Sequence, residues 1–92
     1  METAMKLVVV VIQDVDTPRI MQALLQAGYR VTHVAATGGF MRRGLDTLMI
    51  GVAEEKVDDV IDIIRRHVST ETESSLRRGM VFVLPVEHFE RL

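Results

Sequence analysis

The chain of 92 residues has no cysteine, no tryptophan, one tyrosine and two prolines. The absence of cysteine excludes a disulfide framework, a thiolate nucleophile and thiolate ligands for a metal. The longest apolar run, residues 7–12, is far shorter than the roughly 20 residues that a membrane-spanning helix needs. No secretory signal pattern precedes this run, so we expect a cytoplasmic protein that does not insert into a membrane.

The chain also lacks an excess of charge of one sign. Its 11 basic and 13 acidic residues give a net charge of -2, which provides no long-range attraction to nucleic acid. A hydrophobic share of 48% is typical of a globular domain and not of a disordered chain. We therefore expect one domain over residues 1–92, with residues 1–4 disordered, a flexible loop at residues 69–78 and no nucleic-acid partner.

Two segments at the start of the chain have clear periodicities. Residues 6–13, KLVVVVIQ, are β-branched and too short for a buried helix, which predicts a strand covered on both faces. Asp16 or Thr17 then offers an N-cap oxygen, and Pro18 suits a first helical turn. The predicted helix ends at Gly28 and carries the apolar stripe Ile20, Met21, Leu24 and Leu25.

The centre of the chain alternates with a period of two. Over residues 29–37, YRVTHVAAT, this alternation predicts a second strand on which Arg30 and Thr32 share a face. Residues 46–52, DTLMIGV, predict a third strand. Its Gly51 is typical of a bulge or of a place where another group approaches the backbone.

A second helix is predicted from Glu54 or Glu55 onward, because acidic residues favour a helix start. Its apolar stripe has helical spacing and consists of Val57, Val60, Ile61, Ile64 and Val68. Residues 69–78, STETESSLRR, are polar and lack periodicity. Residues 80–86, MVFVLPV, predict a fourth strand with Pro85 near its end or at an edge.

The predicted order β-α-β-β-α-β is that of ferredoxin-like folds of the α+β class. In these folds a four-stranded antiparallel sheet carries two helices on one face. The predicted strands are apolar at both alternating sets of positions, so the second face also needs a cover. Because no further element remains in the chain, we infer a homo-oligomer with its sheets packed together, in the simplest case a closed ring.

The segment TGGFMRRG, residues 37–44, combines a flexible turn with an aromatic ring and two guanidinium groups. Gly38 and Gly39 allow backbone N–H groups to converge on an anion. Phe40 can stack on a nucleobase, and Arg42 or Arg43 can reach a phosphate. On pattern alone, a plain glycine turn with a packed phenylalanine is the more common arrangement.

Four stretches together resemble the cyclic-di-AMP receptor family of PII-like signalling proteins. They are KLVVVVIQDVD, LLQAGYRVTHVAATGGFMRRG, LMIGVAEEKVDDVIDII and VFVLPVEHFERL. The resemblance implies a ferredoxin-like subunit in a homotrimer, with a ligand in each cleft between neighbouring subunits. The ligand-facing residues that it implies are Arg30, Thr32, Gly39, Phe40, Met41 and Gly51.

The resemblance also implies a role for each of these residues. Phe40 and Met41 pack against an adenine, Arg30 and the turn amides meet phosphate or base edges, and Gly51 leaves room for the ligand. The chain departs from the family pattern at Leu45 and Asp46, where members commonly have Asn and Thr. Near a diphosphate, Asp46 is unfavourable unless it points away or an arginine neutralises it. The connection at residues 69–78 is also shorter than is usual in the family.

Other chemically active side chains form no further motif. The histidines His33, His67 and His88 lack the short spacing of a metal site, so we expect no bound metal. The carboxylates Asp58, Asp59 and Asp62 are expected on a solvated helix face, and Arg77 and Arg78 as a solvated pair. No nucleophile with a base and no Walker sequence is present, so we do not expect an enzyme.

The leading hypothesis is therefore a trimeric PII-like sensor that binds a small nucleotide, cyclic di-AMP by resemblance. It would pass on occupancy through the loops around residues 38–46 and 69–78 to an unidentified downstream protein. The alternative is a trimeric scaffold or metal-tolerance protein of the same fold without a nucleotide site. The fold alone does not choose between them.

Overall fold

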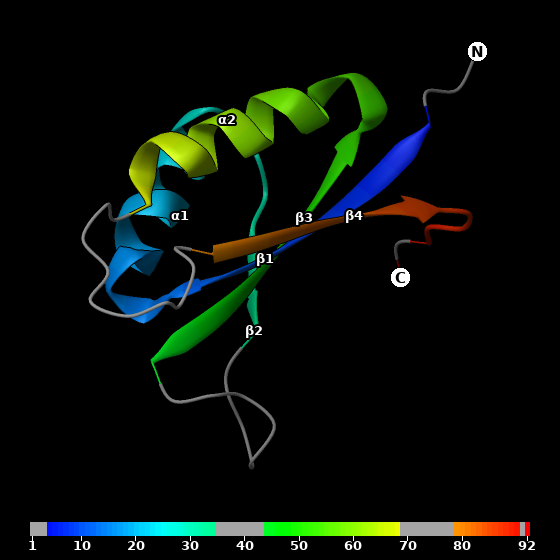
Figure 1. The fold of residues 1–92 in the computed structure, drawn as a ribbon. Helices are drawn as coiled ribbons and strands as arrows, with labels where there is room; N and C mark the ends of the chain where they lie inside the picture. The colour runs from blue at the N-terminus through cyan, green and yellow to red at the C-terminus, as the bar shows by residue number, and fades with distance from the viewer. Residues whose placement is uncertain (1–3, 35–43, 69–78, 91) are drawn as a thin grey trace.

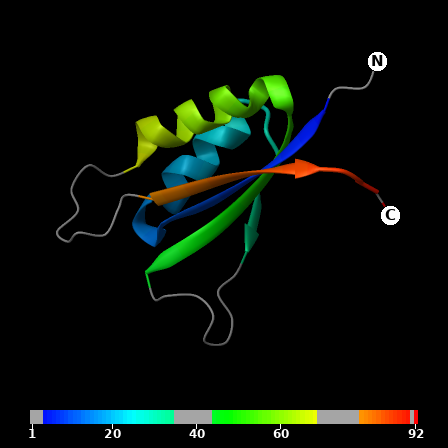
Figure 2. The same cartoon turned by 45° about the vertical axis from the view of Figure 1, so that its right-hand side comes forward.

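Residues 5–13 form a central strand of the sheet, because they pair with a strand on each side. The computed structural model of the protein describes residues 4–34, 44–68, 79–90 and 92. Neighbouring strands are antiparallel, in the order β2 (Thr32–Val34), β3 (Leu45–Ala53), β1 (Met5–Gln13) and β4 (Gly79–Val86). Helices α1 (Thr17–Gln26) and α2 (Val57–His67) lie on one face of the sheet (Figure 1, Figure 2). The predicted ferredoxin-like fold is therefore confirmed.

The core lies between this sheet and the two helices. Every second residue of the middle of β1 is fully buried there, namely Val8, Val10 and Ile12. The helices and β3 complete the core with Ile20, Leu24, Leu48, Ile50, Val52, Val60, Ile63 and Ile64. Burial of one such side chain contributes about 1.5–3 kcal/mol, so this layer is the main source of stability. The other face of β1 is only half-buried within one chain.

The start of α1 differs from the prediction in its capping. Asp16 is the N-cap residue but makes no side-chain cap hydrogen bond. Its carboxylate instead lies 2.5 Å from the guanidinium of Arg19. A 3-10 turn, η1 (Asp14–Asp16), precedes the helix, so the backbone is already helical before α1 begins. After the helix, Gly28 has a φ of 93°, a conformation that glycine adopts without strain.

The second strand begins later than predicted. The backbone N–H of Tyr29 donates a 3.0 Å hydrogen bond to the carbonyl of Leu24, so this residue still belongs to the turn after α1. Among the described residues, Thr32–Val34 pairs with β3. The last part of the predicted strand, residues 35–37, lies outside the described residues.

Two smaller differences concern β3 and α2. β3 pairs with β1 residue by residue, with Gly51 opposite Leu7, so no bulge forms at the glycine. A 3-10 turn, η2 (Glu54–Lys56), delays the start of α2 to Val57. The first residue of this turn donates its N–H to the carbonyl of Ala4, at the edge of the segment expected to be disordered.

The remaining predictions about the ends and the long connection concern residues that are not described. Residues 1–3 and the predicted loop at residues 69–78 fall in this group. Neither helix in the described part of the chain is long and apolar enough to cross a membrane.

Candidate functional site

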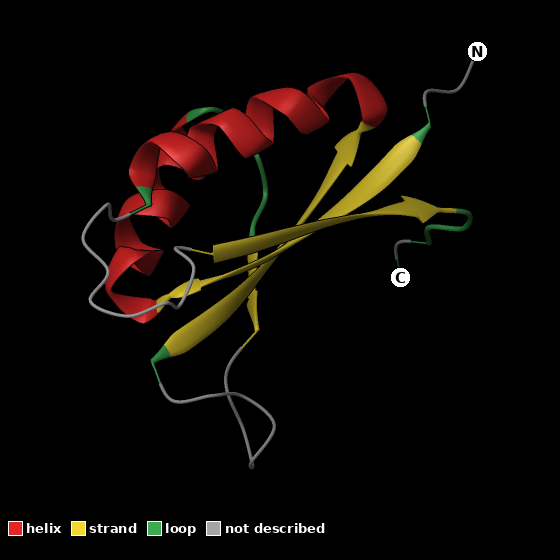
Figure 3. Cartoon of the chain, viewed as in Figure 1, coloured by secondary structure: helices red, strands yellow, loops and turns green. Residues whose placement is uncertain are grey.

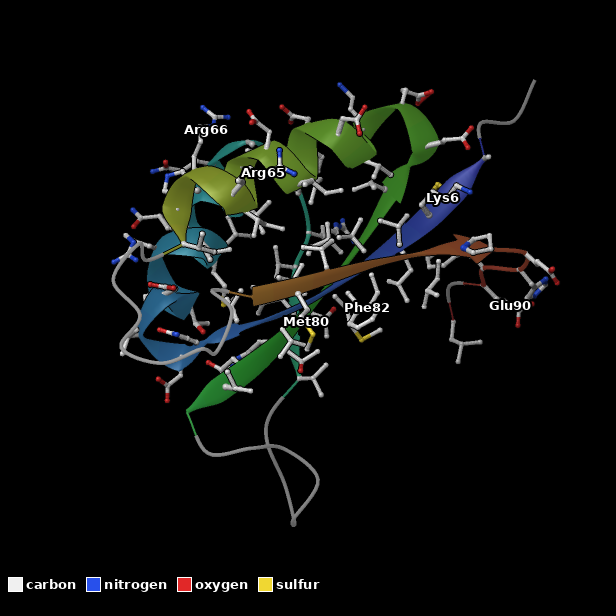
Figure 4. The ribbon with its side chains drawn as sticks, in the orientation of Figure 1. Lys6, Arg65, Arg66, Met80, Phe82 and Glu90 are labelled. Atoms are coloured by element: carbon white, nitrogen blue, oxygen red, sulfur yellow. The ribbon has the colours of Figure 1, made fainter. Side chains whose placement is uncertain are left out.

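The face of the sheet without helices exposes a broad apolar surface in the single chain. The strand register places alternate residues of β1, β3 and β4 on this face. Met80, Phe82 and Leu84 keep 47%, 50% and 47% of their surface exposed. The helices cover the opposite face (Figure 3), and Met80 and Phe82 extend from β4 on the side away from them (Figure 4). Exposed apolar surface of this extent is typical of a binding or association site.

A cavity of about 510 Å³ lies on this helix-free face. Its volume falls in the range of small-molecule sites, roughly 300–1,000 Å³. The cavity is lined by Met5, Lys6, Leu7, Arg30, Thr32, Met49, Gly51, Val86 and Phe89. The fold therefore brings together Arg30, Thr32 and Gly51, three of the residues that the sequence resemblance implied for ligand binding.

The strand register explains why these residues meet. Thr32 lies opposite Met49 in the β2–β3 pair, and Leu7 lies opposite Gly51 in the β1–β3 pair. Because side chains alternate along a strand, all four positions face the same side. A Cβ atom at Gly51 would have no heavy atom within 4 Å. No contact within the chain therefore requires a glycine here. Its effect is to leave the floor of the cavity open.

Arg30 supplies the positive charge that suits this cavity to an anion. Its side chain is exposed, and none of the ion pairs recorded among the described residues involves it. The other cation in the lining, Lys6, lies 3.6 Å from the carboxylate of Glu54. A guanidinium group donates parallel hydrogen bonds to phosphate or carboxylate oxygens. Arg30 is therefore the lining residue best suited to bind a phosphate.

Five predicted residues lie outside the described part of the chain. They are Gly39, Phe40 and Met41, with the possible phosphate contacts Arg42 and Arg43. The strands on either side of this segment are described, because β2 ends at Val34 and β3 begins at Leu45. The roles of these five residues stay predictions.

Phe89 lines the cavity, although no periodic pattern in the sequence assigned it a role. The ring is 67% exposed, so it is not part of the core. Phe89 follows the end of β4, where no alternation indicates the direction of a side chain. Its place in the family-like stretch VFVLPVEHFERL was the one signal that pointed to it. Of the apolar walls, Leu7, Met49 and Val86 were predicted only as strand residues, and Met5 was assigned to no element.

Asp46 does not face the cavity. It alternates in phase with the buried Leu48, so it lies on the helix side of the sheet. Its carboxylate accepts a 2.6 Å hydrogen bond from the Thr17 hydroxyl and lies 3.2 Å from Nε2 of His33. The Thr17 hydrogen bond is the main cause that lowers the pKa of Asp46, His33 adds to it, and burial opposes it. The negative charge thus points away from Arg30, which removes the conflict with an anionic ligand.

The other predicted polar residues form no site in the described part of the chain. Within those residues, no group of three His, Asp or Glu side chains is arranged to hold a metal ion. The Nδ1 atom of His67 lies 2.7 Å from the carbonyl of Ile63, and His88 lies 3.8 Å from Glu90. The α2 carboxylates Asp58, Asp59 and Asp62 are exposed, as predicted.

Comparison with known proteins agrees with this geometry. The sequence profile of the cyclic-di-AMP receptor family matches residues 5–78. A crystal structure of a functionally unknown protein from Pediococcus pentosaceus ATCC 25745 has 34% sequence identity and a TM-score of 0.82, and the match covers 99% of this chain and 100% of that one. Arabidopsis thaliana PII bound to citrate has 26% identity and a TM-score of 0.69, over 92% of this chain and 79% of that one. The chain, with its PII-like fold, belongs to the cyclic-di-AMP receptor family.

Proposed function

We propose that the protein is a PII-like signal-transduction receptor that binds a small nucleotide, cyclic di-AMP, in the cavity on the helix-free face. The observation that carries this proposal is the meeting of Arg30, Thr32 and Gly51 in one cavity with otherwise largely apolar walls. Membership of the receptor family supplies the identity of the ligand. The role is that of a cytoplasmic receptor without enzymatic activity.

The lining suits the two chemical parts of a cyclic dinucleotide. The bases have flat π faces, and stacking on a ring such as Phe89 contributes about 1–3 kcal/mol per base. The phosphates are anionic, and Arg30 can donate charge-assisted hydrogen bonds to them. Thr32 offers a hydroxyl to a base edge or a phosphate, while Gly51 lets the ligand approach the backbone of β3.

We further propose that a homotrimer completes the site, with each cavity in a cleft between subunits. The support is the exposed apolar surface formed by Met80, Phe82 and Leu84, which association of sheet faces would remove from water. Three copies around one axis form a closed assembly. Ligand occupancy would then pass through the loops around residues 38–46 and 69–78 to a downstream protein.

Calorimetry and thermal unfolding with cyclic di-AMP, cyclic di-GMP and ATP test the ligand. Cyclic di-AMP is expected to stabilise the wild-type protein selectively, by about 2.7 kcal/mol at 100 times its Kd. Arg30→Ala should abolish this effect. The matched variant Arg65→Ala removes an equal charge from α2, outside the cavity lining, and should keep the effect. Equal binding by the two variants, or no binding by the wild-type protein, contradicts the proposal.

Sedimentation equilibrium tests the trimer. Phe82→Glu places a charge on the helix-free face and should yield monomers. Val15→Glu introduces the same charge at an exposed apolar residue in η1 and should remain trimeric. The alternative function, a scaffold or metal-tolerance trimer, predicts an intact trimer that no nucleotide stabilises, and metal tolerance predicts stabilisation by divalent ions.

A further inference from the structure

Side chains from three elements meet around one carboxylate on the helix side of the sheet. Asp46 of β3 accepts a 2.6 Å hydrogen bond from Thr17 of α1 and lies 3.2 Å from Nε2 of His33 of β2. Thr17 is 6% exposed, and the side chain of Asp46 is 19% exposed. A hydrogen bond to an ionised group that is largely shielded from water is stronger than one between neutral groups. This cluster therefore joins α1, β2 and β3 at one point.

The cluster supports the strand with the shortest pairing among the described residues. β2 lies at the edge, and its described pairs with β3 run from Thr32 opposite Met49 to Val34 opposite Thr47. His33 lies opposite Leu48, so its contact with Asp46 crosses the pair of strands diagonally. The contact thus holds β2 at the end from which the chain enters residues 35–43.

Asp46 itself stands on a rigid support. It lies opposite Ile12 in the nine-residue pairing of β1 with β3. Two residues before Asp46, the carbonyl of Gly44 accepts a 2.8 Å hydrogen bond from the backbone N–H of Asp14 in η1. The start of β3 is therefore fixed to the body of the domain in two ways besides the Thr17 hydrogen bond. Among the described residues, loss of the cluster would leave β2 held by its backbone pairing alone and leave β3 in place.

β2 and the residues just before it carry polar groups of the cavity on the other face of the sheet. Thr32 directly precedes His33, and because side chains alternate, one lines the cavity while the other faces Asp46. Arg30 lines the same cavity two residues earlier. A shift of β2 therefore moves Thr32 directly, and Arg30 on the side where the chain joins β2, relative to Gly51 and the apolar walls. Binding groups need placement within about 0.5 Å to be fully effective.

We propose that Asp46, held by Thr17, is a positioning residue of the ligand site. It anchors His33 and thereby holds β2 in place. Thr32, and Arg30 just before β2, then keep their positions in the cavity lining. The inference rests on the proposed function, since it assigns the carboxylate a role in ligand affinity without any contact to the ligand.

Paired substitutions at Thr17 test the proposal. Thr17→Val keeps the shape of the side chain and removes the hydroxyl, whereas Thr17→Ser keeps the hydroxyl. Thr17→Val and Asp46→Ala should bind cyclic di-AMP about three- to tenfold more weakly, because each removes a hydrogen bond to an ionised group. Thr17→Ser should bind like the wild-type protein. At the partner position, His33→Gln retains a donor and should bind better than His33→Leu.

A stability control separates positioning from a general loss of structure. Ile63→Val removes one methyl group from the core and should lower Tm without changing Kd, since Ile63 does not line the cavity. Wild-type affinity in Thr17→Val, or an equal loss in Ile63→Val, overturns the proposal.

Amide hydrogen exchange at residues 32–34, measured without ligand, distinguishes failure of the positioning role of Asp46 from failure of the proposed function. If the wild-type protein binds no nucleotide, the proposed function fails. Faster exchange at β2 in Thr17→Val then still supports the anchoring of β2 by Asp46, and unchanged exchange overturns it.

Discussion

The hydroxyl of Tyr29 donates a 2.5 Å hydrogen bond to the carboxylate of Asp59, which links the connection after α1 to the first turn of α2. The backbone N–H of the same tyrosine bonds to the carbonyl of Leu24. The side chain of Tyr29 is therefore held by α2, and its backbone by α1. Because Arg30 is the next residue, this anchor fixes the point at which the chain enters the cavity on the helix-free face.

The Tyr29–Asp59 contact predicts an unusual tyrosine titration. The hydrogen bond to Asp59 is the main cause that raises the pKa of Tyr29 from 10.0 to about 12, followed by burial and by the charge of the carboxylate. A raised pKa means that the pair stabilises the fold below about pH 10 and that this contribution is lost as the pH rises toward 12. Tyr29 is the one tyrosine of the chain, so tyrosinate absorbance reports its ionisation directly.

Substitution of the acceptor provides the test. Asp59→Asn should move the titration midpoint back toward 10.0, whereas Asp58→Asn, at the exposed neighbouring position, should leave it near 12. The same midpoint in both variants would show that the carboxylate is not the cause.

Asp46 predicts the response of the protein to acid. Its folded-state pKa lies below the ordinary value of 3.8, chiefly because of the Thr17 hydrogen bond. The sign follows from linkage: the carboxylate stabilises the fold above about pH 3.8 and loses this effect as the pH falls through the lower folded-state value. Asp46→Asn should therefore be less stable than the wild-type protein at neutral pH, and the difference should shrink in acid.

Urea unfolding across this pH range measures the difference. Glu87→Gln, which neutralises an exposed carboxylate beyond β4, serves as the control and should unfold like the wild-type protein at each pH. A constant difference for Asp46→Asn at all pH values would contradict the role of its charge.

The order of the elements was predictable because each has a clear period, but the exact buried face was not. On α2 the helical spacing predicted Ile61 as a core residue, whereas the structure buries Ile63 and leaves Ile61 half-buried. On α1 the predicted stripe included Leu25, which is 54% exposed. Each helix packs against both the sheet and the other helix, and the direction of these neighbours is not encoded in the spacing of one segment.

The grouping of Arg30 and Thr32 in the cavity lining was predictable from strand alternation, whereas the ligand role proposed for them and for Gly51 came from the family resemblance. The shared face of Arg30 and Thr32 follows from a period of two, and the register of β3 adds Gly51. The contribution of Phe89 was not predictable, because this residue follows the last strand and has no periodic neighbours. The partner of Asp46 was also missed, since Thr17 lies 29 residues away in the chain and meets it only through the packing of α1.

Gly79 at the start of β4 predicts a stability change from close packing. A Cβ atom at this position would lie 2.9 Å from the backbone oxygen of Val11 and 3.2 Å from Cγ2 of Ile12. Neither the backbone of β1 nor a buried side chain can move away easily. Gly79→Ala should therefore lower the free energy of unfolding by about 1–3 kcal/mol. Alanine also lowers the conformational entropy of the unfolded chain, but this stabilising effect is smaller than the cost of the close contact. Urea unfolding provides the measurement, and a gain in stability would contradict the close contact.

Gly51 provides the opposite case, in which stability and binding should change in opposite directions. No heavy atom lies within 4 Å of a Cβ atom placed there, and the backbone is that of a regular strand. Gly51→Val should therefore raise the free energy of unfolding by up to about 1 kcal/mol, because valine favours a strand and restricts the unfolded chain. The added side chain points into the cavity floor, where it should abolish the stabilisation by cyclic di-AMP.

Thermal unfolding with and without ligand measures both effects on one sample. Retained binding would exclude the floor of this cavity as the ligand site, while a loss of stability without ligand would show that another group, such as a second subunit, packs against Gly51.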